Sequence, residues 1–168
     1  MALLYSKAVM ENKITPYIHT HFDRCTGCSI CQLVCSMDLI NGYNPGRARL
    51  AILHKNENLY HFPVVCNQCE NAYCMNVCPA GAITRHETGI VCVDEKRCIG
   101  CGMCVQYCPI DMVQLDADSQ KAVKCELCHG NPLCVEACPT HALELVIPQG
   151  DTIVQRETDK QPSGKGHT

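Results

Sequence analysis

Residues 98–109 read CIGCGMCVQYCP, in which two, two and three residues separate successive cysteines and a proline follows the last one. Three other quartets of this kind occur, and the four quartets contain sixteen of the seventeen cysteines in a chain of 168 residues. The first and third quartets share one spacing, whereas the middle gap widens to four residues in the second and five in the fourth. In chain order the quartets are Cys25, Cys28, Cys31, Cys35; Cys66, Cys69, Cys74, Cys78; Cys98, Cys101, Cys104, Cys108; and Cys125, Cys128, Cys134, Cys138.

This spacing is typical of cysteines that bind iron–sulfur clusters. Two residues between ligands let successive thiolates reach neighbouring irons, and Gly27, Gly100 and Gly102 allow the loop a positive φ close to the cluster. Because every ligand position is a cysteine, we expect four [4Fe–4S] clusters and no three-iron or Rieske centre. Proline follows the last cysteine in three quartets. We therefore expect that cysteine to begin a helix, with the proline at its first position, and to bind the other cluster of a pair.

Two further classes of protein are rich in cysteine, and both fit this spacing less well. A secreted disulfide scaffold needs an export route, and residues 1–7 lack a basic region followed by a long apolar stretch. We therefore expect a cytoplasmic chain without a membrane anchor. A structural zinc protein normally uses two C-x2-C pairs separated by a longer stretch, and eight cysteines in each half of the chain do not follow that pattern.

The composition limits what the chain can do. The chain has no Trp and only two Phe, so its hydrophobic core must be small. The clusters are therefore expected to stabilise the fold by cross-linking distant parts of the chain. The formal net charge is −3, and four clusters with thiolate ligands, each near −2, lower it to about −11. No basic run with interleaved aromatics indicates nucleic-acid binding. No nucleophile elbow, phosphate loop or flavin motif is present, and we expect no catalytic residue.

Short strands are predicted between and around the quartets, which gives an α+β fold. Residues 14–19 favour an edge strand because Pro16 lies within them. Residues 49–53 and 59–62 predict a hairpin with a polar loop at 55–58. The remaining strands are expected at residues 82–84, 90–94, 112–115 and 142–146.

From about Phe22 to Val146 the quartets resemble the iron–sulfur subunits of molybdenum and tungsten oxidoreductases, the dimethyl sulfoxide reductase and formate dehydrogenase family. The wide second and fourth quartets and the intervening hairpin are features of that family. The resemblance implies two nested bacterial-type 2[4Fe–4S] ferredoxin-like units with an inserted β-hairpin. The outer unit would comprise residues 1–36 plus 118–147, and the hairpin and inner unit residues 37–117. Residues 148–168 would form a polar C-terminal tail.

The resemblance also implies which cysteines share a cluster. Cys92 lies outside the quartets, and between two valines it favours a small apolar strand residue that is not a ligand. His129 and His141 lie near the fourth quartet and are expected to be solvated. The implied sets are Cys25, Cys28, Cys31, Cys138 (cluster 1); Cys125, Cys128, Cys134, Cys35 (cluster 2); Cys66, Cys69, Cys74, Cys108 (cluster 3); and Cys98, Cys101, Cys104, Cys78 (cluster 4).

By resemblance the chain is a non-catalytic electron-transfer subunit of anaerobic metabolism. Residues 35–49 look most like the small subunit of tungsten aldehyde oxidoreductases, although Ser36 replaces the usual proline. The implied partners are a catalytic tungsten- or molybdenum-pterin subunit and an acceptor, either a flavin subunit that reduces NAD or a ferredoxin. The alternatives are a subunit of a carbon monoxide dehydrogenase or hydrogenase, and a free-standing polyferredoxin. The sequence leaves open the substrate, catalytic metal, cluster potentials, cluster order, direction of electron flow and self-association.

Overall fold

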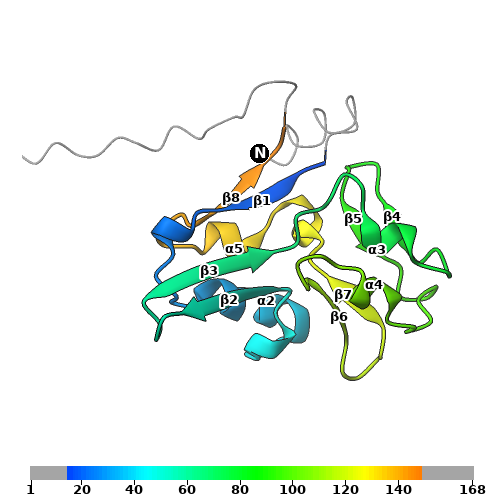
Figure 1. Cartoon of the computed structure of the whole chain (residues 1–168), viewed down its shortest axis with the longest axis horizontal. Coiled ribbons are helices and arrows are strands. Elements are labelled where there is room, and N and C mark those ends of the chain that lie inside the picture. Colours follow the sequence, from blue (N-terminus) through cyan, green and yellow to red (C-terminus); the bar gives the residue numbers. More distant parts are fainter. Residues whose placement is uncertain (1–14, 149–168) are drawn as a thin grey trace, which may run out of the picture.

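The computed structural model describes residues 15–148, and the predicted polar tail at 148–168 lies outside this range except for its first residue. The described chain forms four separate two-stranded antiparallel ladders joined by short helices and loops (Figure 1). The predicted α+β class is therefore confirmed. The ladders pair β1 (Tyr17–Thr20) with β8 (Leu143–Val146), β2 (Leu50–Lys55) with β3 (Tyr60–Val65), β4 (Ile83–Arg85) with β5 (Val91–Val93), and β6 (Val113–Leu115) with β7 (Ala122–Lys124).

The helices are short apart from the first one described. They are α2 (Ile30–Ile40), α3 (Tyr73–Asn76), α4 (Met103–Gln106) and α5 (Leu133–Glu136), with single 3-10 turns η1 (Phe22–Arg24), η2 (Pro45–Arg47) and η3 (Leu127–Gly130). None of these helices is both long and apolar enough to cross a membrane.

The two ends of the described chain lie side by side. Strand β1 pairs with β8 in the register Tyr17↔Val146 to Thr20↔Leu143 (Figure 1). Helix α2 packs against α5, and helix α3 packs against α4. The element that carries the first quartet therefore meets the element that carries the fourth, while the second and third quartets meet each other.

The hydrophobic core consists of two small clusters in which cysteines take a large share. One cluster joins Ile18, Leu50 and Leu143 to buried cysteines of the first, second and fourth quartets. The other is built from small side chains such as Ala82 and Val91 with cysteines of the third quartet. The thin core expected from the composition is thus observed, and no bulky aromatic side chain belongs to either cluster of buried residues in the described range.

The predicted hairpin is confirmed. Strands β2 and β3 pair along their full length, and the loop between them places Asn56, Glu57 and Asn58 in left-handed backbone conformations. Asparagine tolerates such conformations better than most residues, which explains the polar loop sequence. Leu50 and Ile52 of β2 are buried, so one face of the hairpin covers the core.

The prediction that the fourth cysteine begins a helix is wrong. Helices α3, α4 and α5 each contain the third cysteine of their quartet and end before the fourth. The proline that follows the fourth cysteine has no N–H to donate, and its ring disfavours helical backbone at the residue before it. The helix cannot continue through this pair, so Pro79, Pro109 and Pro139 lie in turns after their helices.

Helix α2 is longer because Ser36 stands where the other quartets have proline. Cys35 lies inside this helix of 11 residues, which ends at Asn41 with a left-handed φ of 49°. Ser36 is fully buried, its Oγ donates to the carbonyl of Leu33 at 2.9 Å, and it accepts from the N–H of Asn44 at 3.3 Å. The serine therefore extends the helix and ties it to the loop that follows.

Strand β7 was not predicted from the sequence. It covers three residues, and Lys124 occupies one of its two inward positions, opposite Val113 in the register. A lysine at a buried position hides the alternation of apolar and polar residues that identifies a strand. The strands predicted at 82–84, 90–94, 112–115 and 142–146 are all present within one or two residues of those bounds.

Replacing Ser36 by proline is expected to destabilise the protein. Proline inside a helix costs about 3 kcal/mol or more, and the change also removes the acceptor of the Asn44 N–H. Ser36→Ala, which keeps the helix and loses only the hydroxyl, is the matched control and should cost less. Anaerobic thermal unfolding followed by circular dichroism measures both. A proline variant that unfolds at the wild-type temperature contradicts this account of α2.

Candidate iron–sulfur cluster sites

The structure brings cysteines from different quartets together around shared hollows. Three hollows are each lined by three cysteines of one quartet and one of another. Their cysteines are Cys98, Cys101, Cys104 with Cys78; Cys66, Cys69, Cys74 with Cys108; and Cys25, Cys28, Cys31 with Cys138.

The fourth group combines Cys35 with the first three cysteines of the last quartet, Cys125, Cys128 and Cys134. Burial raises the pKa of the Cys134 thiol, and the nearby charges of Cys125, Cys35 and Cys128 raise that pKa further. All four groups have the same membership as the ligand sets expected from the sequence. That each group binds iron in this combination stays a prediction, and we name the groups by the cluster numbers given above.

The groups form a series. The charge of Cys31 in group 1 acts on Cys134 in group 2, and the charge of Cys66 in group 3 acts on Cys125 in group 2. Groups 3 and 4 meet where α3 packs against α4. Two of the sixteen cysteines, Cys28 in group 1 and Cys101 in group 4, are exposed. The exposed cysteines therefore lie at the two ends of the series 1–2–3–4.

The glycines between ligands are needed for their backbone conformation and for the space beside them. Gly27, Gly100 and Gly102 have φ of 70°, 71° and 73°, as predicted. A Cβ at Gly100 would lie 2.5 Å from the carbonyl oxygen of Gln120, and a Cβ at Gly27 would lie 2.5 Å from Nδ1 of His61. At Gly100 the backbone therefore excludes a side chain, whereas at Gly27 a side chain would require the His61 ring to shift.

Backbone N–H groups point at the sulfurs of the fourth cysteines. In the three quartets with proline the donor is four residues further on, because the chain turns back immediately after the helix. Cys35 lies inside α2 and instead accepts from the N–H of Arg49, fourteen residues away. The pairs are Ala82 to Cys78 (3.3 Å), Met112 to Cys108 (3.3 Å), Ala142 to Cys138 (3.2 Å) and Arg49 to Cys35 (3.3 Å). Such donors stabilise thiolates and influence cluster potentials.

Burial makes seven of these sixteen thiols weaker acids. It raises the pKa of Cys31 and Cys74 to about 11 and that of Cys125 to about 12. At Cys138 burial also acts to raise the pKa, but hydrogen bonds from Ala142 and Thr140 outweigh it and lower the pKa. Buried thiols of this kind ionise when a cationic metal centre binds them, so their arrangement suits a metal-bound state.

The set of donor atoms is the one that four-iron clusters use. Within residues 15–148, no three His, Cys, Asp or Glu side chains are gathered closely enough to hold one metal ion. The sulfurs instead surround hollows, and four thiols with backbone N–H donors form the donor set that a [4Fe–4S] cluster uses.

Cys92, His129 and His141 were expected to lie outside the sites. Cys92 is on β5, where its Sγ lies 3.8 Å from the carbonyl of Ile90, and it lines none of the three hollows. That Cys92 binds no iron stays a prediction. His129 and His141 are exposed, as expected.

Two buried polar residues near the sites were missed in the sequence. Gln68 is 1% exposed, and its side chain donates to the carbonyl of Cys125 at 2.7 Å and accepts from the N–H of Val91 at 2.9 Å. Lys124, also 1% exposed, donates to the carbonyls of the same two residues, Val91 and Cys125. Lys124 comes directly before the first cysteine of the fourth quartet, and this position in the sequence could have indicated a lysine close to a cluster site.

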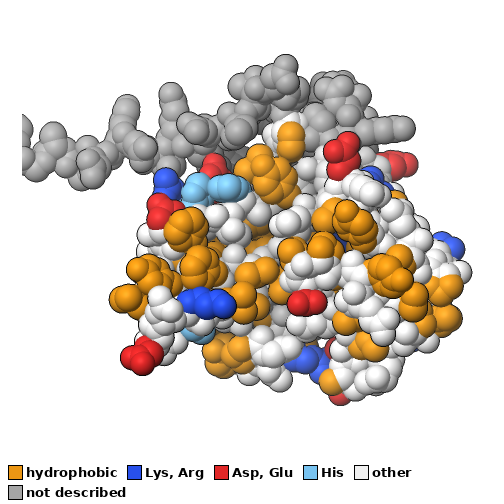
Figure 2. Space-filling model, in the orientation of Figure 1, with side chains coloured by type: hydrophobic (Ala, Val, Ile, Leu, Met, Phe, Trp, Pro, Cys, Tyr) orange, Lys and Arg blue, Asp and Glu red, His pale blue; other side chains and the backbone are white. Residues whose placement is uncertain are grey.

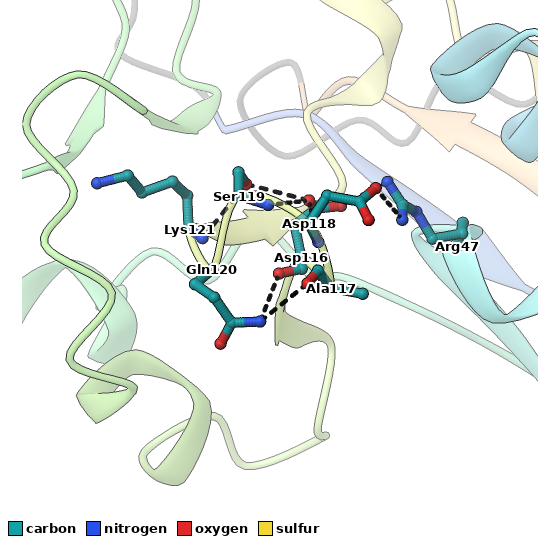
Figure 3. A network of polar contacts seen from close by, with 7 residues as sticks. All are labelled: Arg47, Asp116, Ala117, Asp118, Ser119, Gln120 and Lys121. Carbon is teal, nitrogen blue, oxygen red and sulfur yellow. Dashed lines mark hydrogen bonds and ion pairs between the residues drawn. The ribbon is translucent and has the colours of Figure 1, made fainter.

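An exposed polar network supports the turn between β6 and β7 (Figure 3). The carboxylate of Asp116 accepts from the backbone and side chain of Ser119, which hold its pKa below the usual value. Arg47 pairs with Asp116 and Asp118, both at 2.8 Å, and so joins η2 to this turn. The turn leads to Lys121, which donates to the carbonyl of Cys98. The network therefore fixes the segment beside group 4.

Comparison with known proteins identifies the family. A model described as "4Fe-4S dicluster domain" matches residues 57–147, which is more than half of the chain, and one described as "4Fe-4S binding domain" matches residues 22–38. The chain belongs to the 4Fe-4S dicluster domain family. Its cysteine motifs therefore bind 4Fe-4S clusters, and the predicted ferredoxin-like α+β fold is confirmed.

Relatives in this family come from several oxidoreductases. The chain is 40% identical over 103 residues to the thiosulfate reductase electron transfer subunit PhsB of Salmonella typhi, covering 57% of this chain and 54% of that one. It is 39% identical over 93 residues to the B subunit of the anaerobic dimethyl sulfoxide reductase of Escherichia coli (strain K12), covering 48% and 45%. The predicted relationship to the dimethyl sulfoxide reductase family is therefore confirmed at this level, and the tungsten aldehyde oxidoreductase likeness stays a prediction.

A third relative is the aliphatic sulfonate oxidoreductase, polyferredoxin-like subunit, of Pyrococcus furiosus, 38% identical over 84 residues that cover 49% of this chain and 48% of that one. The chain spans about half the length of the curated relatives it matches. Among solved structures, the active site complex BamBC of benzoyl coenzyme A reductase as isolated aligns with a TM-score of 0.47 and 23% identity over 88% of this chain and 82% of that one.

Gly100→Ala is expected to damage group 4. An alanine at a φ of 71° costs roughly 1–3 kcal/mol, and the added Cβ meets the backbone oxygen of Gln120. Iron per chain after anaerobic purification should fall by up to one cluster, and the unfolding temperature should fall with it. Gly42→Ala is the matched control, because its nearest neighbour would be the oxygen of Ile40 at 3.8 Å. Equal iron content in both variants would refute the steric argument.

Proposed function

We propose that the chain is the electron-transfer subunit of a multi-subunit oxidoreductase and that it holds four [4Fe–4S] clusters. The observation that carries the proposal is the serial arrangement of four cysteine groups with exposed members at both ends only. When bound, such clusters supply one-electron redox chemistry. This chain contributes the sixteen thiols, the N–H donors beside them and the spacing between groups. It acts as a conductor and does no catalysis of its own.

The proposed ligand sets are the four groups of cysteines described above. They divide the chain into nested units, an outer unit of residues 1–36 plus 118–147 and an inner unit with its hairpin at 37–117. Support comes from the contact of α2 with α5, the contact of α3 with α4, and the ladder that joins β1 to β8.

The two ends of the series are proposed docking points for partner subunits. Beside exposed Cys101, Ile99 is 66% exposed and Tyr107 is 53% exposed. Near the opposite end, Phe22 is 60% exposed and stacks on Phe62 with ring centroids 5.7 Å apart. Apolar side chains gather at both ends of the face in Figure 2. Exposed aromatic and aliphatic side chains next to an electron-entry point favour contact with another protein.

The proposed partners are a catalytic tungsten- or molybdenum-pterin subunit at one end and a flavin or ferredoxin-type acceptor at the other. Within this class we favour an aldehyde oxidoreductase, on the sequence of residues 35–49. The relatives named above, from thiosulfate, dimethyl sulfoxide and sulfonate oxidoreductases, support the broader class. We propose a cytoplasmic location because the reducing cytosol keeps thiols free for cluster assembly.

The ligand sets can be tested by cluster content. About sixteen irons per chain are expected, from four irons per cluster. Cys35→Ala should perturb the cluster of Cys125, Cys128 and Cys134, and it should leave that of Cys25 and its neighbours largely intact. Electron paramagnetic resonance of the reduced protein reads out each cluster. Cys92→Ser is the control and should change neither iron nor spectrum. Damage confined to the first quartet's own cluster contradicts the shared sets.

The function can be tested by isolating the native assembly. The chain, tagged in its own host and purified anaerobically, should co-purify with a larger subunit that contains tungsten or molybdenum, detected by mass spectrometry of proteins and metals. Substrate-driven reduction of the complex should bleach the iron–sulfur absorbance. A chain that purifies alone, fully loaded, and exchanges electrons as a free carrier supports the polyferredoxin alternative. A co-purified nickel protein supports the carbon monoxide dehydrogenase or hydrogenase alternative.

A further inference from the structure

Lys124 is the charged side chain that is fully buried in the described part of the protein. Its exposure is 1%, and the other buried polar residues in this range, Ser36 and Gln68, are neutral. An ammonium group removed from water is strongly destabilised unless an opposite charge lies nearby. The ion pairs formed by residues 15–148 do not include Lys124. Among the described residues, no carboxylate in direct contact therefore supplies its compensating charge.

The position of the ammonium group is fixed by the backbone. Nζ of Lys124 donates to the carbonyl of Val91 on β5 and to that of Cys125, the latter at 2.7 Å. Gln68 bonds to the same two residues from another side and holds their backbones in place. Lys124 thus cannot move its charge to solvent without breaking the contact between β5 and β7.

This fixed charge lies beside one cysteine group. Lys124 lines the hollow that contains Cys66, Cys69, Cys74 and Cys108, whereas the linings of the hollows of groups 1 and 4 contain no charged side chain. Lys124 also donates to the carbonyl of Cys125, a member of group 2, but the hollow that its side chain lines is that of group 3.

The other charges close to the sites are in contact with water. Arg85 donates to the carbonyls of Cys69 and Glu70, and Lys121 donates to the carbonyl of Cys98, but both side chains are partly exposed. The carboxylate of Glu126, which accepts from the N–H of Val93 at 3.0 Å, is partly exposed as well. Water weakens the Coulomb interaction of a partly exposed charge several-fold. The buried charge of Lys124 therefore acts on a nearby cluster site more strongly than any of these partly exposed charges.

A reduced cluster carries one more negative charge than an oxidised one, and a nearby buried cation stabilises that extra charge. We propose that Lys124 raises the reduction potential of the cluster held by Cys66, Cys69, Cys74 and Cys108 above the potentials of the other three. An electron entering the chain would then rest at this interior position. The inference depends on the ligand sets of the proposed function.

A redox titration followed by electron paramagnetic resonance tests the inference on the full-length, cluster-loaded protein. Lys124→Met removes the charge, and Lys124→Gln removes it while keeping a group that can donate to a carbonyl. Both should lower the reduction equilibrium constant of one cluster at least tenfold, which is about 59 mV for one electron. Lys96→Met, at an exposed lysine near the third quartet, makes the same charge change and should have a much smaller effect.

The affected cluster is identified with a ligand variant. In the otherwise unmodified protein, Cys108→Ser should alter the signal that appears first on reduction. If Cys108→Ser leaves that first signal unchanged, the proposal is wrong. This test does not depend on whether the Lys124 variants bind iron. Unchanged potentials in a fully loaded Lys124→Gln protein, or a shift no larger than in Lys96→Met, also overturn it. A different result, an iron content well below about sixteen atoms per wild-type chain, would contradict the proposed function and its four clusters.

Discussion

The meeting of each fourth cysteine with three cysteines of another quartet is the contact on which the rest of the fold depends. Each group of four thiols is completed by a residue from a different part of the chain, so the quartets must pair. The contacts of α2 with α5 and of α3 with α4 follow from this pairing. Cysteines take a large share of both core clusters, so the pairing of quartets and the aliphatic side chains around them together hold the four separate ladders in place.

The backbone around each fourth cysteine is controlled by the residue that follows it. Proline ends the helix and turns the chain back, so that an N–H four residues on reaches the sulfur. Ser36 lets α2 continue, and the donor to Cys35 then comes from Arg49 beyond the loop. One substitution of proline by serine thus changes the helix length while a donor to the sulfur is retained.

The protein interior combines buried thiols with a buried ammonium group. Burial raises the pKa of several of these thiols, such as Cys125, whereas hydrogen bonds outweigh burial at Cys138. Metal binding offsets the cost of ionising a buried thiol, because a cationic metal centre stabilises the thiolate. Lys124 carries the opposite charge into the same interior, so thiolates and lysine stabilise each other once the sites are loaded.

The sequence by itself determined the cysteine quartets, the type of cluster, the α+β class and the positions of most strands, because ligand spacing and alternating burial are local properties. It also led to the wrong helix, since the pattern Cys-Pro suits a helix start as well as the turn after one. Only the tertiary structure decided that Lys124 is buried and that strand β7 exists. The reason is physical: a lysine next to a cysteine is ordinarily solvated, and what buries this one is packing between segments far apart in the chain, β5, β7 and the loop of Gln68.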